Sequence, residues 1–252
     1  MPELEDALGI ISYSPALGEG DVRPLAIVQG LEHARPGVRL EWTVSDAHQL
    51  VALPGRDAWL VRSMKSGGFP LLCNNDARAP VMISGRGRAA TSSPGGQPLL
   101  EVHAQLPLDT ESAASATQVL EAIAEGARAY WGHASRKSIG SELARQLQHA
   151  SHGPALSPRG LPMLKPPWRL SSPLIPYHLG WLNYWSAATA HALGFPDPTC
   201  DAEWLAHARR TATGGWVVRL TETPLDFDHP AHLEALRRAY ERFPLIGGRA
   251  SS

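Results

Sequence analysis

The spacing of hydrophobic positions is strand-like in the first part of the chain and helix-like beyond it. Alternation with period two is clearest over 99–106, where every second residue from Leu100 is apolar. Helical spacing is clearest over 112–131, where apolar residues recur every three or four positions behind a possible cap at Thr110 or Ser112. The pattern predicts a protein that contains both strands and helices.

The same criteria predict further elements along the chain. The expected strands cover residues 10–14, 39–44, 69–73, 81–84 and 216–220. The expected helices cover residues 24–33, 56–66, 138–149, 179–193, 201–210 and 231–243. We therefore expect an α+β fold with a mixed or antiparallel sheet and helices packed on one face.

Two segments of biased composition suggest how these elements are divided. Residues 151–177 are rich in proline and lack periodicity, which predicts an extended strap. The strap would join a β-rich α+β half, 1–150, with a ferredoxin-like arrangement, to an α-rich half, 178–252, with one short strand. One continuous domain is the alternative. The second segment, the Gly/Ser-rich stretch 85–98, is expected to be a mobile loop.

Composition excludes several classes of function. The 252 residues carry 23 Lys and Arg against 24 Asp and Glu, so no excess of positive charge marks a nucleic-acid or membrane binder. The two cysteines fit neither a disulfide framework nor a metal-binding spacing. The first residues are acidic, and no apolar run approaches the ~18 residues needed to cross a bilayer. We therefore expect a cytoplasmic protein.

Motifs for catalysis are missing from the sequence. No Gly-x-Ser-x-Gly nucleophile turn occurs, and the segment closest to a phosphate-binding loop, 85–90, lacks the final glycine and opens no helix. We therefore expect no catalytic residues and no cofactor.

A polar cluster near residue 228 leaves one enzymatic alternative open. Two carboxylates and two imidazoles could hold a metal ion in a metal-dependent hydrolase, with ligands Asp226, Asp228, His229 and His232. The competing interpretation is a helix start, in which Asp228 caps the helix and Pro230 fills its first turn. We favour the helix start and expect no bound metal.

An aromatic group in the C-terminal part has two interpretations. If 179–193 is helical, then Trp181, Tyr184 and Trp185 form one ridge. Such a ridge belongs either to the core or to a binding surface, where Trp and Tyr are enriched.

Three C-terminal segments resemble the polymorphic-toxin immunity proteins of the immunity protein fifty-two family. They are 179–186 with its Gly-Trp-x-x-Tyr pattern, 214–221 ending in Leu-Thr, and 224–233 with a Pro-x-His-Leu turn. The chain is also similar to an uncharacterised group of myxobacterial proteins, through 56–59, 93–98 and 240–249.

The resemblance implies an immunity protein that binds and neutralises a cognate bacterial toxin, often a nuclease in such families, encoded by an adjacent gene. Its expected contact residues are the aromatic group Trp181, Tyr184 and Trp185 and the acidic group Glu222, Asp226 and Asp228, the acidic group as a mimic of nucleic acid. A scaffold or regulatory binding protein is a further alternative. The oligomeric state stays open.

Overall fold

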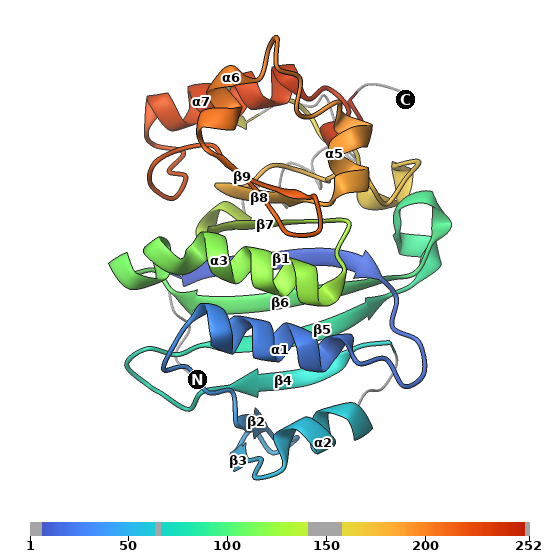
Figure 1. Ribbon diagram of the computed structural model, residues 1–252, viewed down its shortest axis with the longest axis vertical. Helices are drawn as coiled ribbons and strands as arrows, with labels where there is room; N and C mark the ends of the chain where they lie inside the picture. Colours follow the sequence, from blue (N-terminus) through green and yellow to red (C-terminus); the bar gives the residue numbers. More distant parts are fainter. Residues whose placement is uncertain (1–6, 64–66, 141–157, 250–252) are drawn as a thin grey trace.

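The computed structural model describes residues 7–63, 67–140 and 158–249, and these form one antiparallel sheet with helices around it (Figure 1). The strand order is β3-β2-β4-β5-β6-β1-β7-β8-β10-β9. The strands are β1 (Ala7–Pro15), β2 (Trp42–Val44), β3 (Leu50–Ala52), β4 (Phe69–Cys73), β5 (Met82–Arg88), β6 (Leu99–Pro107), β7 (Trp131–Arg136), β8 (Leu182–Trp185), β9 (Ala208–Arg210) and β10 (Trp216–Arg219). The helices are α1 (Arg23–Ala34), α2 (Arg56–Arg62), α3 (Thr110–Ala127), α5 (Ala187–Leu193), α6 (Ala202–Ala206) and α7 (Pro230–Arg242).

The expected arrangement of two unlike halves is wrong, although the broad α+β class fits. β7 pairs with β8 along Trp131↔Trp185 to Ala134↔Leu182, so one sheet runs through both parts of the chain. Within the described residues there is one sheet, without a separate ferredoxin-like sheet, and the part from 158 to 249 contributes three of its strands, so it is not an α-rich half. The proposed boundary near residue 150, and the helix expected over 138–149 beyond residue 140, lie outside the described residues.

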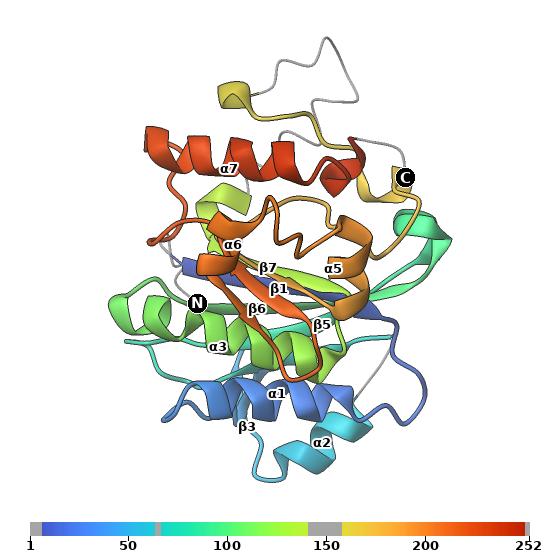
Figure 2. The same ribbon diagram turned by 45° about the horizontal axis from the view of Figure 1, so that its top comes forward.

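α1 and α3 cover one face of the sheet, as Figures 1 and 2 show. α3 starts where the Asp109 carboxylate accepts a hydrogen bond from the Ser112 N–H at 2.7 Å. It ends at Arg128, whose φ of 52° is left-handed, so the chain turns into β7 three residues later. The helix expected near 112–131 is therefore present, but its last residue belongs to a strand.

The segment expected as one helix over 179–193 is a strand followed by a short helix. β8 contains Tyr184 and Trp185, and α5 begins behind Ser186, whose hydroxyl accepts the Thr189 N–H. All four residues of β8 are buried, because α3 lies on one side of it and aromatic side chains such as Phe243, next to Trp185, lie on the other. With both faces buried, the strand shows no alternation that a sequence pattern could reveal.

The stretch 85–98 is integrated into the fold and is not a free loop. β5 takes its first residues, and two 3₁₀ turns, Ala90–Ser92 and Pro94–Gly96, lead into β6. Gly95 N–H donates a hydrogen bond of 2.9 Å to the carbonyl of Leu170 in the strap. The described part of the strap, 158–177, buries Leu164, Leu170 and Tyr177.

Candidate binding surface

One end of the sheet carries a group of exposed apolar side chains. Leu50 and Val51 on β3 are 44% and 42% exposed, and Val61 on α2 is 41% exposed. Figure 1 places β2, β3 and α2 together at this end, furthest from α7, and Figure 2 shows the same position for β3 and α2. We call these three side chains, with the cleft described next, the edge surface. Because Leu50 and Val51 are consecutive in β3, their side chains lie on opposite faces of the sheet and leave both sides of its edge apolar.

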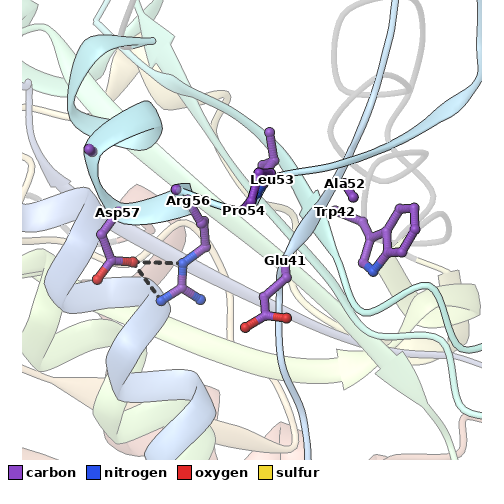
Figure 3. Close-up of a pocket in the computed structure, with 9 residues that line it drawn as sticks. Glu41, Trp42, Ala52, Leu53, Pro54, Arg56 and Asp57 are labelled. Carbon is purple, nitrogen blue, oxygen red and sulfur yellow. Dashed lines mark hydrogen bonds and ion pairs between the residues drawn. The ribbon is translucent and has the colours of Figure 1, made fainter.

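A cleft of about 720 Å³ opens beside β3 (Figure 3). It is lined by residues of β2, of β3 and of the start of α2: Glu41, Trp42, Ala52, Leu53, Pro54, Gly55, Arg56, Asp57 and Ala58. Its volume falls in the range of ligand-binding clefts. α2 begins directly after Gly55, so the cleft lies where the chain passes from the edge strand into the helix.

Carboxylates outnumber cations at this cleft. Arg56 is the one cation among the nine lining residues, and it is already paired with Glu32 and with Asp57, the latter at 2.7 Å. Glu32 also accepts the Leu40 N–H at 2.8 Å, which fixes its position. Glu41 is exposed and makes no side-chain hydrogen bond or ion pair within the described residues. The cleft therefore has a negative local charge.

The three aromatic residues expected at a binding surface lie in the interior. Trp181, Tyr184 and Trp185 are 3%, 2% and 1% exposed. The Trp181 Nε1–H donates to the Thr221 carbonyl at 2.8 Å, and the Tyr184 hydroxyl donates to Glu125 at 3.0 Å. Burial, with the Glu125 carboxylate, raises the pKa of Tyr184. Their location agrees with core packing, the other interpretation of this group.

The expected acidic group lies on the surface, but neighbouring cations neutralise part of its charge. The Glu222 side chain is 70% exposed and contacts Arg219 at 3.1 Å. The Asp228 side chain is 85% exposed and is paired with Arg159 at 2.6 Å. Asp226 is half-buried, and its carboxylate accepts the Asp228 N–H. Paired carboxylates make a weaker mimic of nucleic acid than free ones would.

The four proposed metal ligands are arranged as a helix start. His229, not Asp228, is the N-cap of α7, and Pro230 occupies the first turn. His232 Nδ1 accepts the Asp226 N–H at 3.1 Å, so this nitrogen is occupied. Burial, and the adjacent His229, lower the pKa of His232. Within the described ranges, no group of three or more His, Cys, Asp or Glu side chains is placed to hold a metal ion.

The sequence did not predict a buried aromatic layer between the strap and the sheet. Tyr13 of β1 stacks on Trp131 of β7 with ring centroids 4.1 Å apart, and Tyr177 from the strap contacts both rings. Beside them, the rings of His133 and His178 lie 4.3 Å apart. The Trp131 Nε1, the Tyr177 hydroxyl, both His133 nitrogens and the His178 Nδ1 are buried without a protein hydrogen-bond partner among the described residues.

Sequence reasoning also missed the edge surface. The signal was Leu50-Val51-Ala52-Leu53, an apolar run directly before the turn-forming Pro54-Gly55. The run does not alternate with polar residues, and nothing in the sequence shows that a strand there would lie at an edge.

The protein is of the α+β class and is built on one long antiparallel sheet. One edge of this sheet carries exposed apolar side chains, and the cleft beside it is lined by more carboxylates than cations. The chain belongs to the family described as domain of unknown function DUF5953, whose sequence model matches residues 19–251. No curated protein has a matching sequence. Among solved structures, the chain is similar in fold to the Pseudomonas aeruginosa T6SS protein PA0821, with a TM-score of 0.56 and 17% identity over 94% of this chain and 74% of the other.

No helix in the described ranges is long and apolar enough to cross a membrane.

Proposed function

We propose that this protein is an immunity protein that binds a cognate bacterial toxin in the cytoplasm and neutralises it. The observation that carries the proposal is the edge surface, where exposed Leu50, Val51 and Val61 lie on β3 and α2, the two elements that also contribute residues to an acidic cleft. Inhibitor complexes typically depend on a few apolar or aromatic anchors within a larger polar surface. The edge surface replaces the buried residues Trp181, Tyr184 and Trp185 as the contact site.

Two further observations support the same function. The fold likeness to a T6SS protein extends over nearly the whole chain. The sequence resemblance to the immunity protein fifty-two family lies in β8, β10 and the start of α7, which form part of the same sheet and its cover. A nuclease toxin binds its substrate through basic residues, and the carboxylates of the cleft are complementary to such a surface.

Co-expression with the product of the adjacent gene tests the proposal. We expect the chain to restore growth of the toxin-producing cells and to co-purify with the toxin in a stoichiometric complex. The double variant Val51→Asp, Val61→Asp is expected to weaken the complex about 30-fold or more, because it places charge on apolar anchors. Val22→Asp is the matched control, since Val22 is 63% exposed and belongs to α1's start, outside the edge surface.

Other outcomes identify other functions. If the neighbouring product binds without being neutralised, the chain is a scaffold or regulatory protein. If the neighbour is neither bound nor neutralised, the immunity function is wrong. If charge reversal at Asp226 and Asp228 weakens the complex and the edge variants do not, the acidic group is the contact site instead.

A further inference from the structure

The two edges of the sheet differ in how they are protected from pairing. β9, at one edge, has the sequence Ala-Arg-Arg, and charged residues discourage the addition of another strand. β3, at the other edge, is Leu50-Val51-Ala52, and all three residues are exposed. Its only protection is its length of three residues, because it carries none of the charges, prolines or bulges that also protect edges.

The hydrogen bonds of the hairpin show which backbone groups of β3 are free. Ser45 N–H donates to Gln49 O at 2.9 Å, and Leu53 N–H donates to Glu41 O at 2.8 Å. Because hydrogen-bonded pairs in an antiparallel ladder recur every second residue, Val51 faces Thr43 in such a pair. Leu50 and Ala52 therefore direct their N–H and C=O groups outward, and no described residue accepts or donates there.

The cleft is continuous with this free edge. Ala52 belongs both to β3 and to the lining of the cleft. A strand added to β3 would therefore present side chains to the cleft, and Glu41, the one unpaired carboxylate among the lining residues, favours a positively charged one. Recognition by strand addition combines backbone hydrogen bonds for affinity with a pocket for specificity.

We propose that the free edge of β3 binds an extended, apolar segment of a partner protein as an additional antiparallel or parallel strand, with a Lys or Arg side chain of that segment in the adjoining cleft. The proposal rests on the proposed function for the identity of the partner as a toxin. The recognition mode itself follows from the edge and the cleft.

A display library of random ten-residue peptides, selected on the intact protein, provides the probe. We expect enrichment of peptides with alternating apolar residues and one basic residue, and slowed amide hydrogen exchange at Leu50 and Ala52 in the complex. The Val51 amide should change less, because it already donates within the hairpin. Failure to enrich such peptides, or unchanged exchange at Leu50 and Ala52, would overturn the proposal.

A proline substitution tests the backbone contact without disturbing the β2 ladder. Ala52→Pro removes one outward N–H, a position where edge strands tolerate proline, and we expect peptide binding to weaken at least about tenfold. Ala52→Val is the matched control, because it enlarges the side chain and keeps the N–H. Equal binding by the two variants would refute strand addition.

A charge variant tests the cleft. Glu41→Gln is expected to reduce the preference for a basic residue in the selected peptides, whereas Glu19→Gln, at an exposed position near α1, should leave it unchanged.

If a toxin is neutralised equally by wild type and Ala52→Pro, this inference fails while the immunity function stands. If peptides bind the edge and no toxin exists, strand addition stands and the immunity function fails. A dimer of the chain that Ala52→Pro dissociates would show that a second copy occupies the edge, against the proposal.

Discussion

At the scale of single residues, His133 and His178 are two buried histidines whose pKa is lowered. His133 is 4% exposed, and both of its ring nitrogens lack a protein partner. Burial, together with His178 and His103, lowers the pKa of His133 well below its ordinary value. Burial lowers the pKa of His178 from 6.5 to about 4. Both rings are therefore neutral in the folded protein near neutral pH.

We expect the free energy of unfolding to fall as the pH is lowered from about 6.5 to about 4. In that window the unfolded chain takes up a proton at residue 178 and the folded chain does not, so stability rises with pH. The loss from His178 reaches at most roughly 3.5 kcal/mol. Denaturant titrations at several pH values measure it.

Two variants separate this effect from general acid denaturation. His178→Phe should flatten the pH dependence, because the aromatic ring fills the same space without titrating. His191→Phe is the control, since His191 is exposed on α5. An unchanged slope in His178→Phe would show that this ring does not cause the loss.

At the scale of elements, α1 and α3 approach each other through glycine. A Cβ on Gly126 would lie 2.9 Å from Ile27 N, which is backbone and cannot yield as a side chain can. Gly126→Ala should therefore destabilise the fold by about 1–3 kcal/mol, despite the better helix propensity of alanine. Thermal or denaturant unfolding measures the change.

Gly140→Ala provides the comparison for this prediction. Gly140 is exposed and has open space around its Cβ position. The substitution should be neutral or slightly stabilising. Equal effects at Gly126 and Gly140 would show that the approach of α1 and α3 does not require glycine.

How far the sequence predicted each element depended on how its faces are buried. β6 was predicted because its buried residues alternate with less buried ones. This is the pattern of a strand that is covered mainly on one face. β8 was predicted as a helix because all its residues are buried, and i, i+3, i+4 spacing fits Trp181, Tyr184 and Trp185 equally well. β7 was missed because helical spacing continues past Arg128, whose left-handed conformation no periodicity reveals.

The candidate site was less predictable than the fold. A surface such as the edge of β3 exists only once the other strands have been placed, and strand order depends on contacts far apart in the sequence. Local patterns do identify the residues of α7, whose observed start at Pro230 lies one residue from the expected one. They do not identify which apolar residues remain exposed.

At the scale of the whole molecule, the continuous sheet predicts that the first half does not fold alone. A fragment ending at residue 140 would leave β7 without β8, and would expose Trp131 and Tyr13 where Tyr177 now packs. We expect it to be aggregated or to lack fixed tertiary structure, as measured by near-ultraviolet circular dichroism and sedimentation. A monomeric, cooperatively unfolding fragment would support two separate domains instead.

The position of β1 determines when this sheet can form during protein synthesis. β1 lies between β6 and β7, so Ala7–Pro15 pairs with Leu99–Pro107 on one side and with 131–136 on the other. At ~5–20 residues per second, β1 leaves the ribosome several seconds before either neighbour. During that interval the nascent chain exposes β1 without either of its partner strands. Translation speed between β1 and β7 is therefore expected to control the yield of correctly folded protein.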